Sequence, residues 1–167
     1  MKNQLLILAL IFFSFATAQE DTCPCCTEEH QAFDFWIGTW QVTNSDGTEA
    51  GKNTIEKVED NCVLKERWVG AKGNFTGTSM NFYNQKTNQW EQLWVDNSGT
   101  HLKLKGNRKG NQMILSSDEF VHIDGQHYVN RITWTLNGNG TVRQLWEVLQ
   151  EDKVVNITFD GLYTKLN

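Results

Sequence analysis

The feature that most constrains the fold is a series of ten short runs rich in β-branched and aromatic residues. They lie at residues 39–44, 51–58, 63–69, 77–83, 90–95, 101–105, 112–116, 128–136, 141–149 and 154–163. Val, Ile, Thr, Trp, Tyr and Phe favour pleated, half-buried strands. The links carry Gly, Asn and Asp, as in Asn137-Gly138-Asn139-Gly140, and these residues accept the left-handed backbone of tight hairpins. The pattern predicts a meander of antiparallel strands.

Closure of this meander into a barrel is expected because an open sheet of ten strands would leave exposed edges. Pro24 is the only proline, and no segment after Gly38 keeps a helical repeat. Residues 27–35 predict a short helical turn, in which Thr27 caps the N-terminus beside two acidic residues. The expected fold is therefore all-β, an antiparallel barrel of about 8–10 strands with a short N-terminal helical turn.

The first residues are typical of a secretory signal peptide. Lys2 precedes an apolar run at residues 5–15, and Ala16-Thr17-Ala18 provides a small-residue cleavage site. The run falls short of the roughly 20 residues that span a bilayer. We expect a signal peptide at 1–18, an N-terminal Cys-containing segment at 19–36 and one barrel domain at 37–167. This organisation predicts a secreted or periplasmic protein without a transmembrane span.

Four cysteines in an exported chain indicate disulfides, because the extracytoplasmic space is oxidising. Cys23, Cys25 and Cys26 lie together, and Cys62 stands apart. We expect a bridge from this cluster to Cys62, without a choice of which cysteine forms it. The cluster and His30 could instead bind zinc, but adjacent cysteines strain a tetrahedral site. We therefore expect no metal site.

Charge and motifs exclude several classes of function. The formal net charge is −5 without basic clusters, which argues against a nucleic-acid partner. No nucleophile elbow, zinc-protease motif, Walker loop or dinucleotide fingerprint is present. The histidines at 30, 101, 122 and 127 lie in no recognisable motif. We expect no cofactor, and the alternative is that a histidine at the barrel mouth binds heme iron or acts as a base.

A barrel of this size can enclose a cavity lined by aromatic rings and a few polar groups. In residues 90–96, Trp90, Gln92, Trp94 and Asp96 share one face. We predict that a small ligand meets residues drawn from five strands: Trp68, Asn81, Tyr83, Gln92, Trp94, Arg131, Thr133, Gln144 and Trp146. The alternative is that the rings simply pack against one another.

Charged residues inside the predicted strands provide candidates for catalysis. Glu66 or Asp96 could act as a general base, and Arg131 could hold an anion. A charged side chain that points inward must pair or meet a polar ligand. The alternative is that these residues form cross-strand ion pairs on the outer face.

Several segments resemble an uncharacterised family of secreted bacterial proteins over nearly the whole mature chain. They are the opening Phe33-Asp34-Phe35-Trp36-Ile37-Gly38-Thr39-Trp40, residues 61–64 with Glu66 and Trp68, and residues 90–96, 131–134, 142–147 and 159–163. Gly38-x-Trp40 also resembles the start of lipocalin-type (calycin) and nitrobindin-like heme barrels. The lipocalin resemblance implies that Trp40 packs at a closed barrel end against Arg143 or Lys165. Nitrobindin-like barrels hold heme through a histidine near a late strand, for which this chain shows no clear equivalent.

Three functions remain open at this point. The leading hypothesis is a secreted, lipocalin-like barrel that binds a small, largely apolar ligand. The second is an enzyme on the same barrel, such as a hydrolase, isomerase or cyclase with an inward carboxylate. The third is an envelope interaction or structural protein with an exposed aromatic patch. We favour binding over catalysis, and the sequence predicts neither the ligand nor the oligomeric state.

Overall fold

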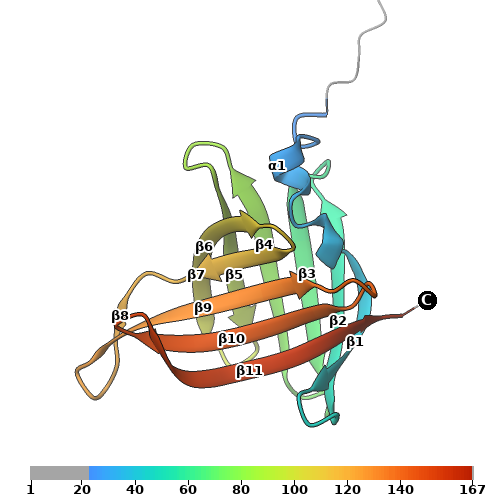
Figure 1. Ribbon diagram of the computed structural model, residues 1–167. Coiled ribbons are helices and arrows are strands. Elements are labelled where there is room, and N and C mark those ends of the chain that lie inside the picture. The colour runs from blue at the N-terminus through green and yellow to red at the C-terminus, as the bar shows by residue number, and fades with distance from the viewer. Residues whose placement is uncertain (1–22, 167) are drawn as a thin grey trace, which may run out of the picture.

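The computed structural model describes residues 23–166, and the predicted signal peptide at 1–18 lies outside this range. The strands follow one another as a meander (Figure 1). They are β1 (Gly38–Asn44), β2 (Glu49–Val58), β3 (Val63–Gly70), β4 (Thr76–Asn84), β5 (Gln89–Asp96), β6 (His101–Lys109), β7 (Gln112–Ser116), β8 (Phe120–Val121), β9 (His127–Leu136), β10 (Val142–Gln150) and β11 (Lys153–Lys165). No helix of this part of the chain is long and apolar enough to cross a membrane.

The sheet closes on itself because β10 pairs with both β9 and β11, and β11 pairs with β1. All pairings are antiparallel, and β8 is an extra strand outside the ten-stranded ring. The predicted all-β, lipocalin-like barrel is confirmed, and each predicted strand corresponds to an observed one. The sequence did not predict β8, which has two residues and pairs only with the start of β9.

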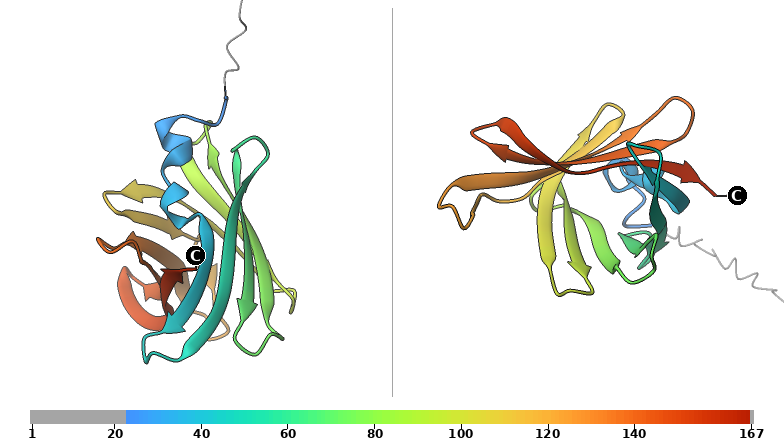
Figure 2. Two further views of the ribbon diagram at one scale, coloured as in Figure 1. Left: turned by 90° about the vertical axis from the view of Figure 1, so that its right-hand side faces the viewer. Right: turned by 90° about the horizontal axis from the view of Figure 1, so that it is seen from below.

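The N-terminal segment closes one end of the barrel (Figure 1; Figure 2, left). Helix α1 (Glu28–Gln31) is capped by Thr27, as predicted, and a 3₁₀ helix, η1 (Asp34–Trp36), follows. Phe33 and Trp36 are fully buried and stack with ring centroids 4.9 Å apart. Apolar burial of this kind is the main favourable term in folding. The segment therefore forms a plug over the closed end of the barrel core.

Trp40 packs at the same closed end. Its Nε1 donates to the Trp36 carbonyl oxygen at 2.8 Å, and the Lys165 Nζ lies 5.4 Å from its ring centroid. Of the two basic partners that the lipocalin resemblance implied, Lys165 makes this contact. Arg143 instead pairs with Asp160, at 2.7 Å.

Two disulfides hold the N-terminal segment. Cys25 pairs with Cys62 and Cys23 with Cys26. The predicted bridge from the cluster to Cys62 is confirmed and is formed by Cys25. Because all four cysteines are oxidised, the alternative zinc set with His30 has no thiolate ligands. His30 is buried and forms a 2.8 Å hydrogen bond with the Thr27 hydroxyl.

Strands β9, β10 and β11 form a long twisted ribbon, and β8 lies at its far end (Figure 1; Figure 2, right). The register between β10 and β11 shifts after Trp146 and again after Val148. Such bulges bend a strand and increase its twist. The ribbon runs across the other strands (Figure 1), and Gln144 and Trp146 of β10 and Phe159 of β11 line the barrel interior.

Candidate functional site

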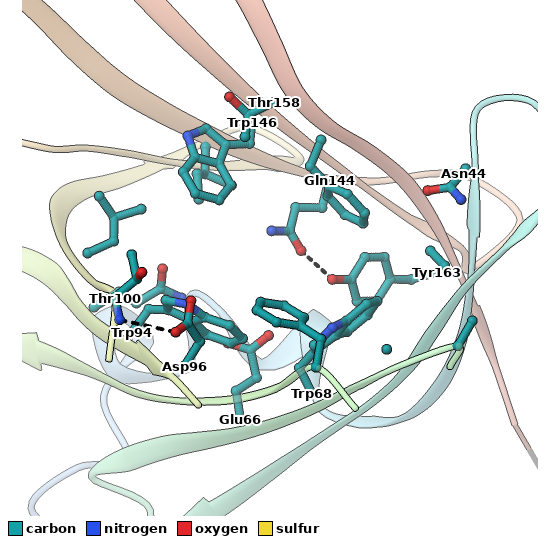
Figure 3. A pocket seen from close by; sticks show the side chains of 18 of the residues that line it. Asn44, Glu66, Trp68, Trp94, Asp96, Thr100, Gln144, Trp146, Thr158 and Tyr163 are labelled. Atoms are coloured by element: carbon teal, nitrogen blue, oxygen red, sulfur yellow. Dashed lines mark hydrogen bonds between the residues drawn. The ribbon is translucent and has the colours of Figure 1, made fainter. Parts of the chain in front are cut away.

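A cavity of about 730 Å³ opens at the end of the barrel opposite to the plug. Its mouth is formed by the turns between β1 and β2, β3 and β4, and β5 and β6, which contribute Asn44, Lys72, Asn74 and Thr100. Its depth is formed by inward residues of the strands (Figure 3). This volume lies in the range of small-molecule pockets.

Aromatic rings from several strands form part of the walls of the cavity. Trp68, Trp94 and Trp146 come from three different strands, and Phe159 packs edge-on to Trp68 with centroids 6.1 Å apart. Trp146 is fixed by its Nε1, which donates to the Asn130 Oδ1 at 2.8 Å. The rings are therefore held by packing and hydrogen bonds rather than left free to collapse into the space.

Trp94 lies against a glycine of the neighbouring strand. A Cβ atom added at Gly77 would lie 2.1 Å from the Trp94 ring. Ring carbons normally approach no closer than about 3.5 Å. The glycine lets the indole lie flat on the β4 backbone, which sets the width of the cavity on this side.

A carboxyl group lies deep in this aromatic cavity. Glu66 of β3 is 5% exposed and lines the cavity, between the indoles of Trp68 and Trp94 (Figure 3). Its Oε1 accepts from the Asn53 Nδ2 at 2.7 Å, and its Oε2 accepts from the Ser79 Oγ at 2.5 Å. The sheet register makes these contacts possible, because Glu66 is directly opposite Ser79 on β4.

The surrounding amides direct their donors toward Glu66. The Asn81 Nδ2 donates to the Leu64 carbonyl oxygen at 2.9 Å, which fixes the orientation of the Asn81 amide. The same Nδ2 donates to the Ser79 Oγ at 2.8 Å, while the Asn81 Oδ1 accepts from the Gln92 Nε2 at 2.7 Å. Because Ser79 accepts from Asn81, its own hydrogen is available for Glu66.

On the other side of Glu66, Asn53 connects it to two groups of the opposite wall. The Asn53 Nδ2 lies 3.4 Å from the Tyr163 hydroxyl oxygen, and that hydroxyl donates to the Gln144 Oε1. Burial raises the pKa of the Tyr163 hydroxyl, and the nearby Glu66 carboxylate raises it further. Tyr163 therefore stays neutral and acts as a hydrogen-bond donor.

Burial raises the pKa of Glu66 from 4.5 to about 7, against the opposing effect of the hydrogen bonds from Ser79 and Asn53. Among the ion pairs formed by residues 23–166, none includes Glu66. A buried carboxyl that is ready to ionise near neutral pH, without a cation of its own, is typical of functional sites.

The structure brings most of the predicted ligand-binding residues together. The cavity is lined by Trp68, Gln92, Trp94, Gln144 and Trp146, and by the catalytic candidates Glu66 and Asp96. Asn81 lies behind this lining, in the hydrogen-bonded cluster beneath Glu66. Tyr83 lies near the plug instead, with its ring 5.2 Å from that of His30.

Besides Asn81 and Tyr83, two further predicted residues do not line the cavity. Arg131 and Thr133 alternate with Ile132 and Trp134 along β9, and it is the latter pair that lines the space. Arg131 forms an ion pair with Glu147 of the neighbouring strand β10, with its Nη2 2.9 Å from the Glu147 Oε2. The alternative expectation, a cross-strand ion pair, therefore applies to Arg131. Its guanidinium pairs with Glu147 and does not line the cavity.

Asp96 lines the mouth, but its carboxylate is used by the turn that follows it. The Asp96 Oδ1 accepts from the Ser98 hydroxyl at 2.6 Å and from the Thr100 backbone nitrogen at 3.1 Å. These hydrogen bonds lower the pKa of Asp96, with the one from Ser98 as the largest cause. The Asp96 carboxylate is therefore engaged by its own turn, whereas the Glu66 carboxyl faces the cavity.

Several residues of the site were missed by sequence reasoning, among them Asn53, Ser79, Trp134 and Tyr163. Ser79 shares a strand face with Asn81, and Trp134 shares one with Ile132, so alternation could have found both once the inward face was known. No group of three or more potential metal ligands occurs in the described part of the chain. Of the histidines, His101 lines the mouth of the cavity.

Fold and site together define a closed antiparallel barrel with an aromatic cavity and one buried carboxyl. A scan against protein-family models found no match for this chain, and a search of curated proteins found no similar sequence. The functional argument therefore rests on the geometry of the cavity.

Proposed function

We propose that this protein is a secreted barrel that binds a small, largely apolar molecule in its aromatic and polar cavity. The observation that carries the proposal is the cavity of about 730 Å³, held open between tryptophan rings from different strands. Binding sites for small molecules are typically apolar, with a few placed polar groups that fix the orientation of the ligand. Glu66, Gln92 and Gln144 are such groups.

The construction of the barrel supports the same function. The plug and its disulfides close one end, while the loops at the other end leave the cavity accessible. Two disulfides fit an oxidising compartment, which supports the secreted or periplasmic location that the first 18 residues predict. The proposal requires no metal and no cofactor.

A second candidate function is catalysis by Glu66. A carboxyl with a pKa of about 7 can act as a general acid or base at neutral pH. Arg131, which was predicted to hold an anionic substrate group, does not support this function, because it pairs with Glu147 and does not line the cavity. A bound compound that is recovered unchanged after prolonged incubation would favour binding, and its conversion by wild type but not by Glu66→Gln would favour catalysis.

The binding proposal is tested with the neutral fluorescent probe N-phenyl-1-naphthylamine. We expect saturable binding with one probe per chain. Leu102→Trp should abolish it by filling the cavity, because Leu102 lines the space. Leu93→Trp is the matched control, since Leu93 lies on the adjacent strand with an exposed side chain. Equal binding by both variants would contradict the proposal.

Native mass spectrometry of the protein from its own host provides an independent test. We expect a stoichiometric small molecule that is released on denaturation. A protein that is empty from its host and also fails to bind the probe would exclude the binding function.

A further inference from the structure

The buried carboxyl restricts the chemistry of the ligand beyond its apolar character. Glu66 is the one buried acidic side chain among residues 23–166, and it faces the cavity. A buried charge is unfavourable unless it is paired and hydrogen-bonded. Its hydrogen bonds are present, from Asn53 and Ser79, but none of the ion pairs among the described residues includes Glu66.

The hydrogen bonds that Glu66 accepts favour its ionised form. Gln92 donates to Asn81, Asn81 donates to Ser79, and Ser79 donates to the carboxylate. Each donor in this series depends on the one before it, so the Ser79 hydrogen stays directed at Glu66. The series leaves a negative charge facing the cavity.

The walls next to Glu66 also favour a cation. The indoles of Trp68 and Trp94 flank the carboxyl (Figure 3). The faces of indole rings attract cations, and tryptophan does so most strongly among aromatic side chains. An anionic ligand group would meet both a carboxylate and these electron-rich faces.

We propose that the ligand carries a protonated amine on an otherwise apolar body, and that this amine pairs with Glu66 deep in the aromatic cavity. The inference rests on the proposed binding function. The amine supplies the missing cation, and the rings of the cavity enclose the apolar body.

Without a ligand, the site can hold a proton instead. The Asn53 Oδ1 has no hydrogen-bond partner in the described structure. Rotation of the Asn53 amide would present this oxygen to a protonated Glu66. The amine and the proton then compete for one carboxylate, so binding of the amine releases a proton.

This competition predicts a pH dependence of binding. Because burial raises the pKa of Glu66 to about 7, an amine should bind about tenfold more weakly at pH 6 than at pH 8. The other titratable groups that face the cavity are Tyr163 from β11 and, at its mouth, Glu49, Lys72, Asp96 and His101. His101→Gln separates any contribution of that histidine from the contribution of Glu66.

The test uses three ligands with one phenyl body: 4-phenylbutylamine, 4-phenyl-1-butanol and 5-phenylpentanoate. Isothermal titration calorimetry at pH 8 should show that the amine binds at least tenfold tighter than the alcohol, and the acid most weakly. Glu66→Gln should remove the advantage of the amine and leave the alcohol within threefold. Glu56→Gln, at an exposed acidic residue of β2 that does not line the cavity, is the matched control and should keep that advantage.

The outcomes separate this inference from the binding function. Binding of the alcohol or the acid with no preference for the amine would overturn the inference and leave the binding function intact. An amine preference that survives Glu66→Gln would also overturn it. Binding of none of the three ligands, or of the probe N-phenyl-1-naphthylamine, would overturn both.

Discussion

Replacement of Glu66 by Gln should stabilise the unliganded protein above pH 7 and change little near pH 4. Burial raises the pKa of Glu66 from 4.5 to about 7 in the folded protein, whereas the unfolded chain exposes the carboxyl to water. Between these two values the folded state keeps a proton that the unfolded state has lost. The stability of the wild type therefore falls as the pH rises through this window.

The size of the effect follows from the same two values. Each pH unit between 4.5 and 7 lowers the free energy of unfolding by about 1.4 kcal/mol. The contribution is fully present below pH 4.5, and about 3 kcal/mol is lost above pH 7. A glutamine does not titrate, and its amide can donate to the Asn53 Oδ1, which has no partner in the described structure. The Glu66→Gln variant should therefore fold, and its free energy of unfolding should not fall in this way as the pH rises.

The assay is urea unfolding, followed by tryptophan fluorescence, at pH values from 5 to 8. The difference in unfolding free energy between Glu66→Gln and wild type should grow by about 2 to 3 kcal/mol over this range. Glu56→Gln removes an exposed carboxylate of the neighbouring strand and should show no such growth. Parallel stability curves for wild type and Glu66→Gln would refute the reasoning.

Three further predictions concern the disulfide, the cavity wall and the outer face. Loss of the Cys25–Cys62 bridge, which spans 37 residues, should lower the free energy of unfolding by about 4 kcal/mol in urea titrations, more than loss of the three-residue Cys23–Cys26 bridge. Gly77→Ala should push Trp94 into the cavity and weaken probe binding at least tenfold, whereas Gly138→Ala, with nothing within 4 Å, should not. Arg131→Ala should leave probe binding unchanged and cost less than about 1 kcal/mol of stability, because its ion pair is partly exposed.

Local sequence patterns predicted the strands well because β-propensity and turn chemistry are both read from neighbouring residues. Strand β8 escaped because two residues, Phe120 and Val121, are too short a run to show alternation. The sequence did predict the turn at Asp124-Gly125, which follows β8. One part of the hairpin that β8 forms with β9 was therefore predicted, and the strand β8 was not.

The candidate site was harder to predict because alternation groups residues by face without saying which face is inside. On β5 the aromatic and amide residues share the inward face, and Gln92 and Trp94 were placed correctly in the lining. On β9 both faces are of mixed polarity. Arg131 was therefore predicted to point inward, whereas Ile132 and Trp134 of the other face line the cavity. The inward face of β9 depends on its pairing with β7 and β10, which no local pattern contains.

The polar cluster depends on register even more strongly. Glu66 was a candidate because a charge inside a strand is unusual, but its partners come from two other strands. Ser79 is directly opposite Glu66, and Asn53 is opposite Trp68, two residues further along β3. A shift of register by one residue would turn every one of these side chains to the other face. The cluster therefore becomes visible only once the barrel is assembled.

The two ends of the barrel differ in how their interiors are filled. At the closed end, disulfides and stacked rings hold the plug. In the cavity, a carboxyl is kept in an apolar environment where its ionisation destabilises the empty protein above pH 7. A residue chosen only for packing would remove this penalty, and the proposed amine ligand would restore the lost stability on binding. The same substitution, Glu66→Gln, should then stabilise the empty protein and weaken its binding of an amine, two opposite effects that a purely structural role for Glu66 does not predict.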